Sequence, residues 1–188
     1  SIDNFKPGQV LETNSFVLGS LIEDCGGNYS THNMLLDDSA KIKQVVRKAA
    51  TEDYQMILIL GGSSAGSEDF AKRVIFDLGQ VLVHGVTIMP GKPVLAGDVQ
   101  GYPVFGMPGY PVSAALTGQL FVLPLLKHWL GQAAPRYDTI KATLTRKLVS
   151  PTGDDDFVRV TVGQVGDRTL VTPLARGAGV ITSLVRAD

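Results

Sequence analysis

The fold is decided by residues 55–70, which read QMILILGGSSAGSEDF. The apolar run from Gln55 to Leu60 predicts a strand that is buried on both faces. A loop rich in glycine and serine follows, and residues 69–78 then place apolar side chains at the spacing of one helix face. Strand, glycine loop and helix in this order form a βα unit, which indicates an α/β domain with a mostly parallel sheet.

The same alternation of helix and strand patterns covers about the first 130 residues. The other expected elements are a helix capped by Thr13 or Asn14, a strand from Tyr29 to Leu35, a helix capped by residue 37, 38 or 39, strands within 80–107, and a long apolar helix from Val112 to Leu130. The elements would pack in three layers, with helices on the two faces of the sheet.

The chain changes character after Gly131 to Pro135, which has the composition of a linker. Thr139 to Leu148 and Phe157 to Val165 alternate with a period of two, and Arg168 to Leu174 gives a third strand pattern. No helical period appears there. We therefore predict an α/β domain at residues 1–133 and a small all-β domain at residues 134–188.

Composition excludes several classes of protein. The 188 residues carry a formal net charge of -1, which does not favour a nucleic-acid backbone or an anionic membrane as partner. Cys25 is the only cysteine, so neither an intrachain disulfide nor a zinc site of several cysteines is possible. A reducing, cytoplasmic location is expected. The longest apolar runs are shorter than the roughly 18 residues that span a bilayer.

Three loops could bind an anion. The first, from Gly61 to Asp69, combines free backbone N–H groups with a helix N-terminus, and Asp69 could hold magnesium beside a phosphate. The alternatives are a plain tight turn and, for Asp69, an acid that complements the helix dipole. The second loop, Met89 to Pro93, presents Lys92 on a frame stiffened by two prolines. A solvated lysine is the alternative there.

The third loop, Met107 to Ser113, lies between a strand and the long helix. Ser113 and nearby N–H groups could contact an anion, although Ser113 could also simply cap the helix. Because loops at the carboxyl ends of parallel strands converge, three of them favour a polyanionic ligand. The acidic run from Asp154 to Asp156 is typical of a solvated turn, with a metal role as the alternative.

These motifs resemble one known family. The matching residues are Gly61-Gly62-x-Ser64-x-Gly66-x-x-Asp69, His84-Gly85-Val86 before Pro90-Gly91-Lys92-Pro93, and Val104 to Ser113 with its Met107-Pro108-Gly109-Tyr110-Pro111 core. They are similar to the MoeA family of molybdopterin molybdenumtransferases, which includes the gephyrin E domain. Asp37-Asp38 and Phe157 to Val160 resemble further parts of that family.

The resemblance implies molybdenum cofactor biosynthesis, in which molybdate is inserted into adenylylated molybdopterin and AMP is released with Mg²⁺. It assigns Asp69 and Lys92 as catalytic residues and Asp69 as the metal ligand. The implied substrate-binding residues are Gly61, Gly62, Ser64, Gly66, Pro90, Gly91, Pro93, Pro108, Gly109, Pro111 and Ser113. The alternatives are a non-catalytic molybdate- or pterin-binding or scaffold module, and a related molybdopterin adenylyltransferase.

The sequence departs from the family at Gly85 and Met89, where lysine is usual, at Ser67, where an acid is usual, and at Tyr110, where asparagine is usual. Basic residues are also usual near Asp154 and Asp155. The family's first strand and amino-terminal domains would precede residue 1, so we expect a piece of a longer enzyme. An open sheet edge in their place would favour a homodimer. A molybdopterin adenylyltransferase is a further expected partner.

Overall fold

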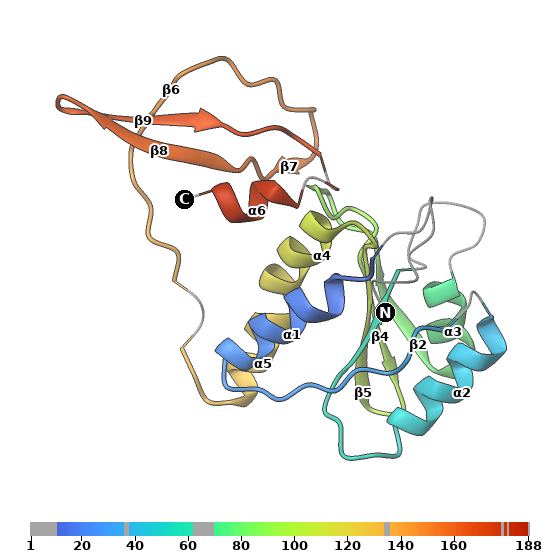
Figure 1. Ribbon diagram of the computed structural model, residues 1–188. Coiled ribbons are helices and arrows are strands. Elements are labelled where there is room, and N and C mark those ends of the chain that lie inside the picture. Colours follow the sequence, from blue (N-terminus) through green and yellow to red (C-terminus); the bar gives the residue numbers. More distant parts are fainter. Residues whose placement is uncertain are drawn as a thin grey trace.

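The computed structural model describes residues 11–35, 38–61, 70–133, 136–177, 179 and 181–187. Its larger part is a four-stranded sheet with helices on both faces, and a smaller β-rich part lies beyond one end of that sheet (Figure 1). This arrangement confirms the expected α/β domain followed by a small β domain. None of the helices in the described residues is long and apolar enough to cross a membrane.

The sheet has the strand order β1-β5-β4-β2. Its strands are β1 (Ile57–Leu60), β2 (Gln80–His84), β4 (Leu95–Val99) and β5 (Tyr102–Met107). The expected parallel pairing applies to β1 and β5, whereas β4 is antiparallel to both β5 and β2. The reason is the two-residue turn Gln100-Gly101, whose φ values of 57° and 88° are those of a hairpin turn.

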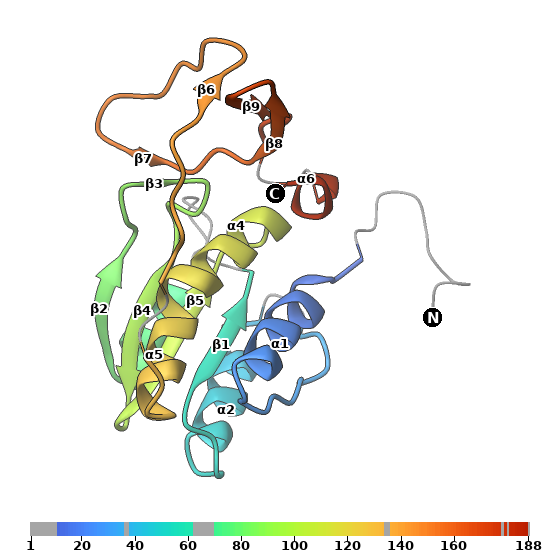
Figure 2. The same ribbon diagram turned by 90° about the vertical axis from the view of Figure 1, so that its left-hand side faces the viewer.

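Helices α2 (Ser39–Ala49) and α3 (Phe70–Leu78) cover one face of the sheet, and α1 (Asn14–Asp24) lies on the other (Figures 1 and 2). Successive residues of a strand point to opposite faces of the sheet, so alternate side chains pack against the two helical layers. On β5, Val104 packs with Val46 and Ile75 on the first face, while Phe105 packs with Leu18 on the second. The central strands β4 and β5 are therefore largely buried. The edge strand β1, predicted to be buried on both faces, contacts both core clusters but is only half-buried along its length, and β2 is mostly exposed.

The expected long helix is confirmed as one continuous helical run of three segments. These are α4 (Pro111–Thr117), a π-helical segment η2 (Gly118–Val122) and α5 (Leu123–Trp129). Pro124 has no N–H to donate, which interrupts the regular α-helical bonding where η2 meets α5. The run covers the same sheet face as α1 (Figure 2).

The predicted strand from Tyr29 to Leu35 is wrong, because residues 27–35 form no regular element. Tyr29 instead packs on α1, where a Cβ added at Gly19 would lie 2.3 Å from the tyrosine ring. Ser30 Oγ donates a hydrogen bond of 2.7 Å to the Tyr54 hydroxyl. Side-chain contacts thus hold this segment where an extended pattern predicted backbone pairing.

The carboxyl-terminal part contributes strands to two small sheets. One joins β6 (Thr143–Leu144), β9 (Arg168–Pro173) and β8 (Val160–Val165), and the other pairs β3 (Ile88–Met89) with β7 (Asp155–Asp156). The strand predicted at Thr139 to Leu148 is reduced to β6. A helix, α6 (Thr182–Arg186), appears where no helical period is visible, since five residues are too few to show one.

Candidate functional site

Gly61, where the first predicted loop begins, lies beside the third predicted loop. Gly61, which follows β1 with a φ of 80°, donates its N–H to the Met107 carbonyl at 3.2 Å. A Cβ added at Gly109 would lie 3.8 Å from the Gly61 Cα. The parallel register Leu60↔Met107 produces this contact, because it brings the carboxyl ends of β1 and β5 to the same edge.

The third loop is held from the far side by a residue that the sequence analysis missed. Asn14 is 7% exposed, and its Nδ2 donates to the Gly109 carbonyl at 2.9 Å. Its sequence position at a helix start suggested only a cap. The observed contact, across 95 positions of sequence, has no local signal.

Ser113 lies in the first turn of α4 and is 3% exposed. Tyr110 occupies the N-cap position and Pro111 begins the helix, so the alternative role of Ser113 as the cap is wrong. Among the other predicted residues of this loop, Pro108 is buried and Gly109 is exposed. The turn therefore presents an exposed backbone above a buried serine.

The second loop packs against the same helical run. Gly91 has a φ of 116°, and a Cβ there would lie 2.7 Å from Thr117 Cγ2. The Lys92 carbonyl accepts a hydrogen bond from Val86 N at 2.9 Å. Thr117 in turn donates from Oγ1 to the Ser113 carbonyl at 2.8 Å. The glycine of the Lys92 loop thus lies one helical turn from Ser113, with the half-buried Pro90 and Pro93 beside it.

Lys92 is paired with a carboxylate from the carboxyl-terminal part. Its Nζ lies 3.0 Å and 3.1 Å from the two carboxylate oxygens of Asp154. The solvated turn that the composition of 154–156 predicts therefore holds only for Asp155, because the other two carboxylates form ion pairs. The Asp154 side chain is 11% exposed, and that of Asp156 is 9% exposed and pairs with Arg176 at 2.9 Å.

Four of the predicted binding and catalytic residues, Gly62, Ser64, Gly66 and Asp69, lie outside the described residues, as does Ser67. Within the described ranges, no group of three or more His, Cys, Asp or Glu side chains could hold a metal ion. The assignment of Mg²⁺ to Asp69 therefore stays a prediction.

Arg159 is a second residue of interest that sequence reasoning did not select. Burial lowers the pKa of its guanidinium below the ordinary value, and its Nε donates to Ser183 Oγ at 2.8 Å. It borders a cavity of about 270 Å³ between the helical run and the carboxyl-terminal part. The signal was present, since a cation interrupts the apolar pattern of residues 157–160. The cavity is lined by Val112, Ala115, Leu116, Gln119, Phe157, Val158, Arg159, Val160, Leu184 and Ala187.

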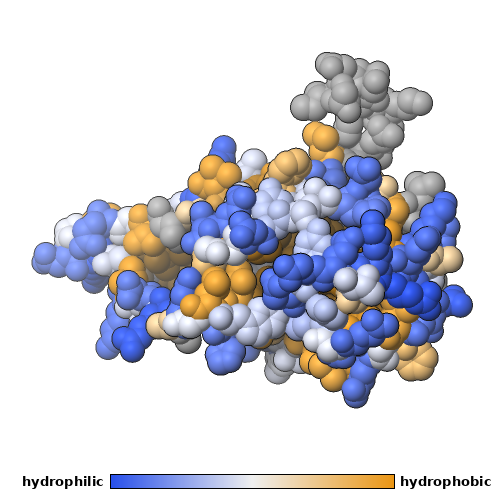
Figure 3. All heavy atoms as spheres, turned by 90° about the horizontal axis from the view of Figure 1, so that it is seen from below, coloured by the Kyte–Doolittle hydropathy of each residue, from blue (hydrophilic) through white to orange (hydrophobic). Residues whose placement is uncertain are grey.

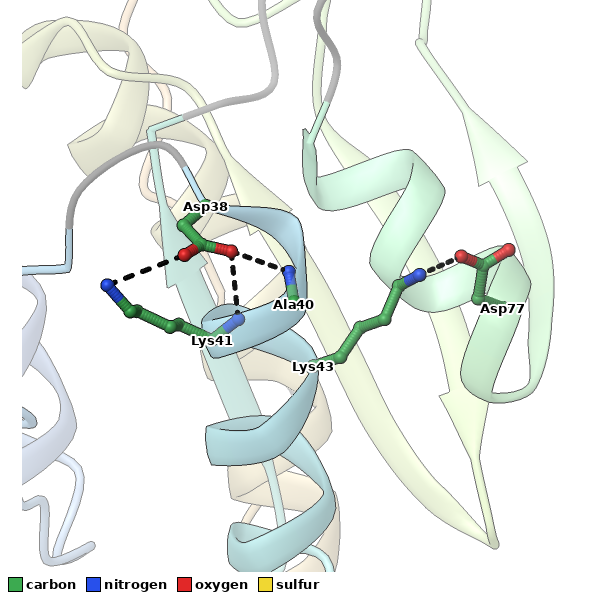
Figure 4. Close-up of polar contacts among 5 residues, drawn as sticks. All are labelled: Asp38, Ala40, Lys41, Lys43 and Asp77. Carbon is green, nitrogen blue, oxygen red and sulfur yellow. Dashed lines mark hydrogen bonds and ion pairs between the residues drawn. The ribbon is translucent and has the colours of Figure 1, made fainter.

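A basic surface depression lies over α2 and α3, away from Lys92 in the fold. Asp38 caps α2, accepting from the N–H groups of Lys41 and Ala40, and these bonds lower the pKa of its carboxyl (Figure 4). Lys43 donates to Asp77 and lowers the pKa of that carboxyl (Figure 4). The depression is lined by Asp38, Ser39, Ala40, Lys43, Arg47 and Arg73.

The side of the molecule seen in Figure 3 is mainly hydrophilic. Hydrophilic residues cover most of this face, with smaller hydrophobic areas between them.

The chain matches two family profiles over most of its length. One is described as the probable molybdopterin binding domain and matches residues 3–128, and the other, the MoeA C-terminal region (domain IV), matches residues 141–188. The α/β part of the chain thus falls in the molybdopterin binding domain family.

Two relatives show the extent of the similarity. A molybdopterin biosynthesis protein of Methanocaldococcus jannaschii is 34% identical over 96% of this chain and 42% of its own length. Molybdopterin molybdenumtransferase 2 of Mycobacterium tuberculosis is 32% identical over 82% of this chain and 39% of its own. The chain thus spans about two fifths of the curated relatives it matches.

A solved structure agrees with this similarity. The MoeA protein of Pyrococcus horikosii superposes with a TM-score of 0.77 and 36% identity over 98% of this chain and 44% of its own. The chain therefore belongs to the MoeA-type family of molybdopterin molybdenumtransferases, a family of molybdenum cofactor biosynthesis.

Proposed function

We propose that this chain supplies the substrate-binding loops of a molybdotransferase, which inserts molybdate into adenylylated molybdopterin and releases AMP. The observation that carries the proposal is that Gly61, where the first loop begins, lies at the same sheet edge as the third loop, with its N–H bonded to the Met107 carbonyl. The Lys92 loop packs on the helix that begins at this edge. Exposed backbone groups and a lysine suit a phosphoanhydride and a tetrahedral oxyanion.

The roles divide by chemistry. Gly61, Gly62, Ser64 and Gly66 bind pterin and phosphate groups, and Asp69 holds the magnesium that phosphate oxygens bind. The Lys92 ammonium donates hydrogen bonds to molybdate near Ser113. The prolines at 90, 93, 108 and 111 keep the two Pro-Gly loops in shape, because each fixes its own φ. A homodimer and a molybdopterin adenylyltransferase as supplier of substrate complete the proposal.

The proposed contact between Lys92 and molybdate is tested by calorimetry of the chain with sodium molybdate. Lys92→Ala should weaken binding by about tenfold, since it removes one charged hydrogen bond. Lys127→Ala is the matched control, because it removes the same charge on α5, about 20 Å farther along the helical run than Ser113. Equal affinity of the two variants would remove Lys92 from the site.

The adenylate part is tested with ADP and Mg²⁺. Binding that requires magnesium and is lost in Asp69→Asn would support an adenylate site on the loop 61–69. Binding that is indifferent to Asp69→Asn would contradict the role given to that residue.

A non-catalytic binding or scaffold module is the second candidate, and a specific observation favours it. Asp154 neutralises Lys92, and the positions of Gly85 and Met89 add no positive charge. Such a module would bind molybdate or pterin in the full-length protein without releasing AMP. An adenylyltransferase is less well supported, because the match to the MoeA C-terminal region spans residues 141–188.

A further inference from the structure

We infer that Asp154 is a built-in competitor for the oxyanion site, and that an oxyanion reaches Lys92 by displacing the Asp154 carboxylate. The inference rests on the proposed function, in which Lys92 contacts molybdate. In this inference, Asp154 controls the affinity of Lys92 for the oxyanion. Oxyanion binding then competes with the Lys92–Asp154 ion pair, which joins the two parts of the chain.

The contact has the geometry of an occupied anion site. Both carboxylate oxygens of Asp154 lie within hydrogen-bond distance of Lys92 Nζ, at 3.0 Å and 3.1 Å. A tetrahedral oxyanion would present two oxygens to the ammonium in the same way. The Lys92 side chain is 60% exposed, so the ammonium is open to solvent and to an incoming anion while it is paired.

The carboxylate is held in place by backbone bonds on its carboxyl-terminal side. Asp155 N donates to the Thr87 carbonyl and Phe157 N to the Met89 carbonyl, both at 2.8 Å. These bonds form the β3–β7 ladder, which ends three residues before Lys92. The β3–β7 ladder therefore holds Asp154 close to Lys92, so the Asp154 carboxylate is present at a high local concentration around the ammonium.

The neighbouring carboxylates have different surroundings. Asp156 pairs with Arg176, which belongs to the carboxyl-terminal part and also donates to the Val149 carbonyl. Asp155 is exposed, and it contributes its backbone to the ladder. Among the described ion pairs, Asp154 is the one of these three carboxylates that pairs with Lys92. The run therefore contains its own matched control, Asp155, which carries the same charge one position away.

The size of the effect follows from how often the pair forms. Exposed ion pairs of ordinary strength are formed for about 60–85% of the time, and the apparent affinity for a competing anion falls in proportion to the free fraction. Removing the carboxylate charge should therefore tighten molybdate binding by about two- to sixfold.

The test is calorimetry with sodium molybdate on the wild-type chain, Asp154→Asn, Asp155→Asn and the double variant Lys92→Ala/Asp154→Asn. We expect Asp154→Asn to bind molybdate about fivefold more tightly than wild type. Asp155→Asn should bind as wild type does, and the double variant should lose the gain. Thermal unfolding of each variant establishes that the compared proteins are folded.

The outcomes separate this inference from the proposed function. If Lys92→Ala weakens binding but Asp154→Asn leaves it unchanged or weaker, the inference is wrong and the proposed site stands. An equal gain in Asp154→Asn and Asp155→Asn reports net charge alone and also overturns it. If no variant binds molybdate, both fail. Should Asp154→Asn unfold, Asp154→Ser, which is also uncharged, takes its place under the same criteria.

Discussion

Replacing Gly91 with alanine should damage the Lys92 loop for two separable reasons. The φ of 116° is one that side chains rarely adopt, and this strain costs about 1–2 kcal/mol. The new Cβ would also lie 2.7 Å from Thr117 Cγ2 and 3.1 Å from Ile88 Cδ1, and overpacking of this kind costs about 1–3 kcal/mol. We expect Gly91→Ala to lower the free energy of unfolding by about 2–5 kcal/mol.

Gly101→Ala is the control that isolates the steric part. Gly101 has a φ of 88°, and a Cβ there would have no atom within 4 Å. Its replacement should cost only the backbone strain of about 1–2 kcal/mol. Urea unfolding measures both variants, and a difference of about 1–3 kcal/mol between them should remain.

The contact partner can be tested directly through Thr117. Thr117→Ser removes Cγ2 but keeps the hydroxyl that donates to the Ser113 carbonyl at 2.8 Å. In the wild-type background, loss of this buried methyl group should lower the free energy of unfolding by about 1 kcal/mol. In the Gly91→Ala background, the same change should restore stability. Equal losses in Gly91→Ala and Gly101→Ala, with no rescue by Thr117→Ser, would refute the packing argument.

Three further predictions concern residues that hold other parts of the structure. Asn14→Ala should lower the free energy of unfolding by about 1 kcal/mol in urea, because it leaves the Gly109 carbonyl without its donor; Asn14→Asp should lose at least as much, and full stability of Asn14→Asp would contradict this role. The pKa of the Asp38 carboxyl is lowered in the folded state, so the charged cap stabilises the fold above the ordinary carboxyl pKa, and this stabilisation is lost as pH falls through the folded pKa. The difference in Tm between wild type and Asp38→Asn should therefore shrink on acidification. A difference in Tm that grows would contradict this role. Arg159→Lys should lower the free energy of unfolding by about 1 kcal/mol in the same urea assay, because lysine cannot reproduce the hydrogen bond from Nε to Ser183. Unchanged stability would argue against a stabilising role of that bond.

Local patterns predicted the elements well where packing and periodicity agree. The apolar run ending at Leu60 forms a strand covered on both faces, and residues 111–129 form a continuous helical run. The hairpin between β4 and β5 was missed, because Gln100 is an unusual residue at a positive φ and gives a weak turn signal. The extended pattern at Tyr29 failed because side-chain packing on α1 outweighs it.

The candidate site shows a different limit. The loops themselves could be found from glycine and proline, since these residues fix local backbone conformation. Their supports could not, because the Asn14–Gly109 bond joins residues 95 positions apart and the Lys92–Asp154 pair joins residues 62 apart. Such contacts depend on how complete elements pack, and no spacing rule within one segment encodes them.

The Lys92–Asp154 pair changes the electrostatic interpretation of the site. Sequence alone gives the Met89 to Pro93 loop one positive charge, but the carboxylate at 3.0 Å makes the pair neutral at a distance. Long-range attraction of a dianion by this loop is therefore weak, since opposite charges this close largely cancel beyond the Debye length of about 8 Å. If Lys92 binds the proposed oxyanion, selection must then occur at short range, through the ability of the oxyanion to replace a carboxylate on the ammonium. A dianion has the advantage in that exchange, because it offers more charge to the same three N–H donors than Asp154 does.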